Sequence, residues 1–182
     1  MIDLVLDIDG VKKNYKVPEN WNEVNMRTFE LIANVNSQDE NDFLGSMKVF
    51  AALTGMSMDD VMLLPVDELP EVLKLVSFAN TTIEEKEVDS IVIDGEEYFM
   101  KKDMDKLTTG EVLSLDHLAK KYENNIQAGM SEMLCVFLRR KIDGKLESFK
   151  SEFMERAELF RDKVMVSDVY HLFLFFSSGK SK

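Results

Sequence analysis

The chain has 182 residues, enough for one ordinary domain or two very small ones, and 45% of them are hydrophobic. Its 34 acidic and 22 basic residues give a net charge of −12, which disfavours binding to the phosphate backbone of a nucleic acid. The single cysteine excludes an internal disulfide, and no apolar run is long enough to cross a membrane, so neither a disulfide-stapled domain nor a membrane protein is predicted.

The first ten residues do not resemble a signal peptide. They contain no basic cluster, and Asp3 and Asp7 interrupt their apolar stretch. A chain without disulfides fits a reducing compartment. We therefore expect a cytoplasmic location.

A β-hairpin is predicted at the start of the chain. Residues 2–8 alternate apolar and polar side chains, which is the period of a half-buried strand. Asp9-Gly10 suits a two-residue turn in which both central positions need a positive φ. The returning strand is expected to end at Pro18, because proline has no N–H to donate.

Four helices are predicted between residues 25 and 79, each after a residue that can cap a helix. Ser57 and Asp60, like Ser37 and Glu40, are spaced as in a capping box. The expected caps are Asn25, Ser37, Ser57 and Asp67.

The pattern begins again after a polar connector at residues 81–90. A second hairpin is predicted around Asp94-Gly95, and Thr108 with Glu111 forms another capping box. Further helices are expected around residues 130–138 and 149–160, separated by a chain break at Asp143-Gly144. A last helix, opened by Ser167 or Asp168, is apolar nearly all round and must be buried by its own fold or by a partner.

These similarities indicate an internal repeat. Ile8-Asp9-Gly10 corresponds to Ile93-Asp94-Gly95, and residues 21–25 correspond to residues 104–108. The predicted fold class is α+β, mostly helical, with two short antiparallel hairpins in a duplicated hairpin-plus-helices arrangement. Residues 1–80 and 91–182 would form the two units, packed together as one globule. Because an isolated hairpin is marginally stable, the two hairpins should either share one sheet or each lie on their own helices.

One motif favours an enzyme. Residues 4–11 resemble the first motif of the haloacid dehalogenase phosphatases, an apolar strand that ends in Asp-x-Asp-Gly. The resemblance implies Asp7 as nucleophile and Asp9 as general acid/base, with magnesium beside them. Such enzymes need a parallel sheet, and the remaining sequence lacks the later strands and acidic pair of that family. The phosphatase is therefore the alternative hypothesis.

The other candidate reactive residues favour structural roles. Neither His117 nor His171 has a second histidine or a cysteine at ligand spacing, and Cys135 stands among apolar residues, as an inert buried thiol does. We predict no catalytic, cofactor or metal site. Arg139, Arg140 and Lys141 form the one compact basic group, interpreted as a solvated helix end.

Three segments together resemble proteins of tailed-bacteriophage structural modules, of the tail or baseplate assembly type that includes tail assembly chaperones. They are residues 17–25 with Phe29, in which Asn25 replaces the usual threonine, residues 106–112, and the closing stretch from Arg156 to Ser177. The resemblance implies a non-enzymatic protein that contacts other virion proteins.

We therefore expect a phage morphogenesis or virion-associated protein that binds tail, neck or baseplate components, in the host cytoplasm or in the virion. Other phage structural proteins are the expected partners; nucleic acid and membrane are not, and a homo-oligomer is left open. A second alternative is an acidic regulator or inhibitor of a basic protein. The candidate partner-binding residues are Trp21, Tyr170, Phe173 and Phe176.

Overall fold

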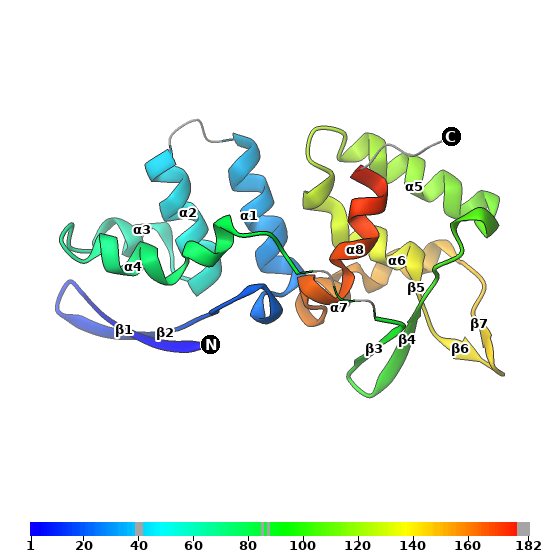
Figure 1. Cartoon of the computed structure of the whole chain (residues 1–182), viewed down its shortest axis with the longest axis horizontal. Helices are drawn as coiled ribbons and strands as arrows, with labels where there is room; N and C mark the ends of the chain where they lie inside the picture. Colours follow the sequence, from blue (N-terminus) through cyan, green and yellow to red (C-terminus); the bar gives the residue numbers. More distant parts are fainter. Residues whose placement is uncertain (39–41, 85, 87, 178–182) are drawn as a thin grey trace.

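The structure, a computed structural model, describes residues 1–38, 42–84, 86 and 88–177; the side chains of 36–38, 42 and 173–177 are not described. The predicted α+β class is confirmed, and helices dominate (Figure 1). The α-helices of the described chain are α1 (Met26–Gln38), α2 (Asp42–Thr54), α3 (Met58–Met62), α4 (Leu69–Leu75), α5 (Thr109–Lys121), α6 (Met130–Phe137), α7 (Ala157–Lys163) and α8 (Val166–Ser177). Short 3-10 helices are η1 (Trp21–Glu23), η2 (Ser77–Asn80), η3 (Met104–Lys106), η4 (Ile126–Gly129) and η5 (Ser151–Arg156).

The first predicted hairpin is present as β1 (Ile2–Ile8) and β2 (Val11–Val17), joined through Asp9 at φ 52° and Gly10 at φ 79°. It pairs with no other strand of the described chain and lies on its own helices. The Lys13 ammonium group stands 2.8 Å from the Asp60 carboxylate of α3, which fastens the hairpin to that helix.

The second hairpin, β3 (Ser90–Ile93) and β4 (Glu96–Met100), turns through Asp94 at φ 50° and Gly95 at φ 86°. It belongs to a three-stranded antiparallel sheet, because the short strand β5 (Leu138–Arg139) pairs with β4.

A third hairpin stands where a simple chain break was expected. Strands β6 (Lys141–Ile142) and β7 (Lys145–Leu146) pair through Asp143 at φ 52° and Gly144 at φ 76°. Ile142-Asp143-Gly144 repeats the tripeptide of the two other turns, so each of the three hairpins has the same turn signal in the sequence.

Most of the expected helix caps are present. The Asn25 side chain accepts the Thr28 N–H at 3.0 Å, and the Ser57 hydroxyl accepts the Asp60 N–H at 3.1 Å. Thr108 and Glu111 form a complete capping box.

The other expected caps have a different outcome. The last helix, α8, begins at Val166, so the prediction that Ser167 or Asp168 opens it is wrong. The Asp67 prediction is wrong, since Glu68 is the N-cap of α4 and caps through no side-chain bond. Ser37 lies within α1, and its expected partner Glu40 lies outside the described residues.

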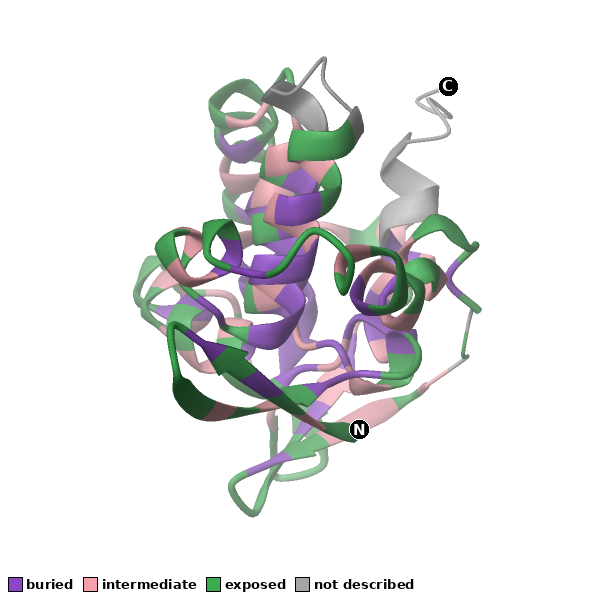
Figure 2. Cartoon of the chain, turned by 90° about the vertical axis from the view of Figure 1, so that its left-hand side faces the viewer, coloured by how far each residue is buried: buried purple, intermediate pink, exposed green. Residues whose placement is uncertain are grey.

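The segments that precede α1 and α8 join the two halves. The Val166 N–H donates to Val24 O and the Met26 N–H donates to Val164 O, each at 2.9 Å. All four side chains are buried. Figure 1 shows α1 and α8 starting near this central point, and one continuous cluster of buried side chains extends through both halves (Figure 2).

Arg139 does not belong to a solvated helix end, which corrects the interpretation of the basic group. Its side chain is 1% exposed and lies in contact with the rings of Phe149 and Phe153. Its guanidinium donates to Glu111 Oε1 at 3.0 Å and to Cys135 O at 2.5 Å. The sequence position next to Arg140 and Lys141 gives no sign of this burial.

Glu111 joins this buried pair to the capping box of α5. Burial alone would raise its pKa, but hydrogen bonds from Lys101, the Thr108 N–H and Arg139 outweigh burial and lower the pKa to about 2. The ordinary value is 4.5. The stabilisation that Glu111 contributes is therefore complete above about pH 4.5 and is lost as the pH falls towards about 2.

We expect Glu111→Gln to lower the free energy of unfolding by about 3–5 kcal/mol at neutral pH, because it leaves the buried Arg139 charge uncompensated. Urea unfolding at a series of pH values would measure this. The difference from the wild type should shrink as the pH falls from about 4.5, where Glu111 of the unfolded chain becomes protonated, towards about 2, where Glu111 of the folded protein does. Glu96→Gln, which removes an exposed partner of Arg140, is the control and should cost less than about 0.5 kcal/mol. Equal losses in the two variants would contradict the buried pair.

Gly129 marks a close approach of η4 to the end of α5. A Cβ atom on Gly129 would stand 2.2 Å from the Tyr122 ring, whereas one on Gly110 would stand at an ordinary 3.5 Å from the Phe149 ring. We expect Gly129→Ala to destabilise the fold by about 1–3 kcal/mol and Gly110→Ala to be neutral or stabilising by up to about 1 kcal/mol. Thermal unfolding should show a lower melting temperature for Gly129→Ala and an unchanged or higher one for Gly110→Ala.

Candidate partner-binding groove

Trp21 is held in the core by local and distant backbone. The Asn20 side chain caps η1 by accepting the Asn22 N–H at 3.0 Å, which fixes the start of the turn. The indole is 8% exposed, and its Nε1–H donates to Thr81 O at 3.1 Å. Trp21 therefore ties the first half of the chain to the connector.

An aromatic cluster surrounds the indole. Trp21 meets Phe29 of α1 and Phe78 of η2 edge to face, with ring centroids 5.8 Å and 5.5 Å apart. Phe29 meets Tyr170 of α8 in the same manner at 6.2 Å. Edge-to-face pairs bring the positive edge of one ring to the negative face of the next, so the four rings hold one another in fixed orientations.

Three of these rings, those of Trp21, Phe29 and Tyr170, line a groove of about 330 Å³ between the two halves, named here the aromatic groove. Trp21, Phe29 and Ile32 come from the first half, and Gln127 and Tyr170 come from the second. The end of η2 and the start of the connector add residues 79–83 as one wall. Most of its lining residues are aromatic or aliphatic, but they are largely buried, and the surface left accessible in the groove is more polar than apolar. A groove of this size suits a short segment of a partner chain, bound through polar and apolar contacts together, rather than a large ligand.

The structure brings together two of the four predicted partner-binding residues. Trp21 and Tyr170, distant in sequence, line the same groove. Phe173 and Phe176 follow in α8, and their side chains lie outside the described part of the chain. Thr81 and Gln127 were not predicted, because neither belongs to an apolar pattern or a motif.

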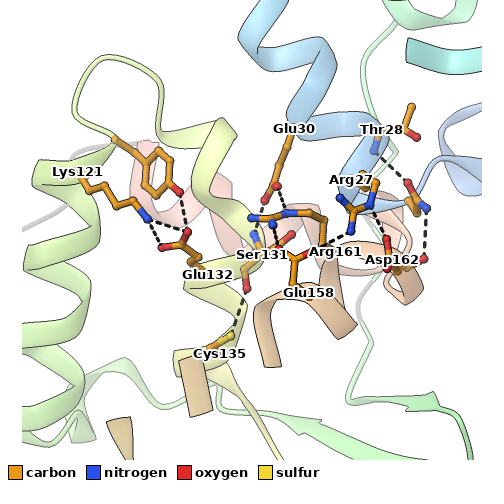
Figure 3. Close-up of polar contacts among 12 residues, drawn as sticks. Arg27, Thr28, Glu30, Lys121, Ser131, Glu132, Cys135, Glu158, Arg161 and Asp162 are labelled. Carbon is orange, nitrogen blue, oxygen red and sulfur yellow. Dashed lines mark hydrogen bonds and ion pairs between the residues drawn. The ribbon is translucent and has the colours of Figure 1, made fainter. Parts of the chain in front are cut away.

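Polar side chains meet where α1 faces α6 and α7, and this contact is named here the polar seam (Figure 3). Glu30 of α1 accepts the Ser131 N–H at 2.7 Å, so a buried carboxylate of one half caps the N-terminus of α6 in the other. Its second oxygen accepts from Arg161 Nε at 2.7 Å. Arg161 also pairs with Glu158.

The seam contains a second cavity, of about 460 Å³, lined by Arg27, Lys121 and Arg161 among others. Each of these cations has a carboxylate partner: Arg27 pairs with Asp162 at 2.5 Å, and Lys121 pairs with Glu132 at 2.8 Å. The hydrogen bonds that Arg27 donates to Asp162 and Glu158 raise the pKa of Arg27. The cations that line this cavity are therefore already paired with carboxylates of the protein.

Asp7 and Asp9, the catalytic residues of the phosphatase hypothesis, do not line either of these two cavities. Asp7 is exposed and stands opposite Lys12 in the antiparallel β1–β2 pair, and Asp9 occupies the turn. Burial raises the pKa of the Cys135 thiol to about 12, which suppresses its reactivity. Over the described residues, no group of three or more His, Cys, Asp or Glu side chains is placed to hold a metal ion.

Comparison with models of protein families, with curated proteins and with solved structures finds no match to this chain. None of the helices in the described ranges combines the length and the apolar character needed to cross a bilayer.

We expect Trp21→Ala to cost about 3–5 kcal/mol of unfolding free energy, because it removes the ring that Phe29 and Phe78 contact. Trp21→Phe keeps a ring but loses the hydrogen bond to Thr81 O, and should cost about 1 kcal/mol. Urea unfolding followed by circular dichroism measures both. A cost below about 1 kcal/mol for the alanine variant would contradict a core role for the indole.

Proposed function

We propose that this chain is a non-enzymatic protein of phage morphogenesis that binds a tail, neck or baseplate component through the aromatic groove. The observation that carries the proposal is the meeting of Trp21 and Tyr170 in one groove. These residues lie within two of the three segments that resemble phage structural proteins. A shared binding role would explain why the two segments carry aromatic residues that meet in one groove.

The chemistry of the groove supports a protein partner. Aromatic and aliphatic residues form most of its lining, and exposed Thr81, Thr82 and Gln127 add hydrogen-bonding groups to an accessible surface that is more polar than apolar. Buried anchors in a preformed apolar pocket surrounded by polar contacts are typical of binding hot spots. The rigid aromatic cluster means that little ordering free energy is lost when a partner binds.

The phosphatase alternative has less support. The acidic motif of Asp7 and Asp9 lies on a two-stranded antiparallel hairpin, and the strand pairs of the described residues are all antiparallel. The phosphatase motif requires its strand to lie within a parallel sheet, with other strand ends beside the aspartates. The other alternative, an acidic regulator of a basic protein, predicts the same fold as the assembly protein and a different partner. The identity of the partner therefore distinguishes the two hypotheses.

The proposal is tested by placing a photo-crosslinking residue at Gln127, on the groove rim, and in a control at Val92, which is exposed on β3 outside the groove. The tagged proteins are irradiated in the cells that naturally produce them, which are infected cells if a phage encodes the chain. Crosslinked partners are then identified by mass spectrometry. We expect virion proteins at Gln127 and none of them at Val92.

Two further variants, Gln127→Trp and Thr82→Trp, should fill the groove mouth and abolish the crosslink without disturbing the core, because both side chains are exposed. Capture of a basic, non-virion protein in a salt-sensitive complex would instead favour the regulator. Equal crosslinking from Gln127 and Val92 would show that the groove is not the binding site.

A further inference from the structure

The first hairpin has a free edge. Strand β1 pairs only with β2 in the described chain, and residues 2–8 make no backbone hydrogen bond to any other described segment. In Figure 1 the hairpin forms the lower border of the first half, with α3 and α4 above it. An unpaired strand edge of this kind can accept a further strand through its own backbone.

The turn decides which backbone groups of β1 face outward. A two-residue turn is flanked by a pair that exchanges both of its backbone hydrogen bonds, and here this pair is Ile8 with Val11. Hydrogen-bonded and non-hydrogen-bonded pairs then alternate along an antiparallel ladder. The N–H and C=O groups of Asp3, Val5 and Asp7 therefore point away from β2.

The β1 edge lacks the usual protection against pairing. Sheet edges are commonly protected by proline, by lysine, by a bulge or by a very short strand. Strand β1 has 7 residues without a proline or a lysine, and its register with β2 is unbroken over its whole length. Val5 at its middle is 56% exposed. Strand β2, in contrast, contains Lys12, Lys13 and Lys16.

The exposed face of the hairpin sorts its charges by strand. Asp3 and Asp7 lie along β1, and Lys12 and Lys16 lie opposite them along β2. A strand added to β1 would have the aspartates one strand spacing away, at about 5 Å, and the lysines two spacings away, at about 10 Å. Asp7 has no ion-pair partner among the described residues, and the pair of Asp3 with Lys16 joins side chains that are 72% and 67% exposed. The edge therefore presents negative charge to an incoming strand.

A second copy of β1 is a poor occupant of this edge. In the antiparallel register that pairs the whole of β1 with its counterpart, Asp3 of one copy faces Asp7 of the other. Like charges placed directly opposite destabilise a strand pair, whereas opposite charges stabilise it. The charge pattern thus selects a strand that has two basic side chains on one face, four positions apart.

We propose that the β1 edge binds an extended segment of another protein, antiparallel to β1, with basic residues opposite Asp3 and Asp7. The backbone of this segment would pair with Asp3, Val5 and Asp7. The intramolecular partner β2 already has the required pattern, since Lys16 lies opposite Asp3 and Lys12 lies opposite Asp7. The interaction uses none of the residues that line the aromatic groove, so it stands or falls separately from the function proposed above.

The probe is a synthetic peptide with the sequence of residues 11–17, blocked at both ends, added to the purified full chain. Amide hydrogen exchange measured by NMR reports on each backbone N–H separately. Without peptide, the N–H groups of Asp3, Val5 and Asp7 should exchange rapidly, whereas β2 protects those of Leu4 and Leu6. Saturating peptide should slow the exchange of the first three by about tenfold or more and leave the other two unchanged.

Two controls separate strand pairing from a general attraction of basic peptides to an acidic protein. The same peptide with Lys12→Glu and Lys16→Glu should bind at least about tenfold more weakly. Val5→Pro in the protein removes an outward N–H but keeps the net charge and the bonds to β2, so it should abolish peptide binding. Val5→Thr, which keeps the N–H, should bind the peptide like the wild type.

A charge reversal keeps the test decisive if the proline variant does not fold. Asp3→Lys with Asp7→Lys should reverse the preference, so that the glutamate peptide binds more tightly than the lysine peptide. The proposal is overturned if the wild type binds both peptides equally, if a folded Val5→Pro variant binds as the wild type does, or if no peptide protects the edge. Protection of the same amides by self-association without peptide would overturn the choice of another protein as the partner.

Discussion

The arrangement of the molecule depends on a short antiparallel contact between two strand-like segments, one before α1 and one before α8. Two backbone hydrogen bonds join Val24 to Val166 and Met26 to Val164, in a setting where all four side chains are buried. Because the contact fixes where both helices begin, it sets Phe29 of α1 beside Tyr170 of α8. The aromatic groove and the polar seam both follow from this one constraint.

Charge has two different roles in this acidic chain. Inside, Glu30, Glu111 and Glu147 are each paired with an arginine. Glu30 and Glu111 join segments distant in sequence, whereas Glu147, which follows β7, pairs with the end of η5 nine residues later. A buried carboxylate or guanidinium without its partner is costly, so these pairs specify which elements meet. Outside, ion pairs such as Lys120 with Asp116 join exposed side chains, where water and salt screen them and leave them little effect on stability. The net charge of −12 gives no indication of this difference between buried and exposed pairs.

The features predicted correctly are those that local chemistry decides. Asp9-Gly10 forms a hairpin turn because of its own backbone preference, and Thr108 with Glu111 forms a capping box because of spacing alone. Arg139 was misjudged, since its burial depends on Glu111 and on two phenylalanines that only the tertiary fold brings near. The aromatic groove was half predicted: apolar patterns single out Trp21 and Tyr170, but no pattern shows that they meet. Residues 178–182 lie outside the described chain.

The position of α8 late in the chain has a consequence for the order of events during synthesis. Domains form from the N-terminus as the ribosome delivers them, so the Trp21 and Phe29 side of the aromatic groove emerges long before Tyr170 does. The opposite wall of the groove, and the backbone contact that positions it, exist only after Val166 has been added. The groove therefore forms only after α8 has been synthesised, and a shorter nascent chain cannot present it to a partner.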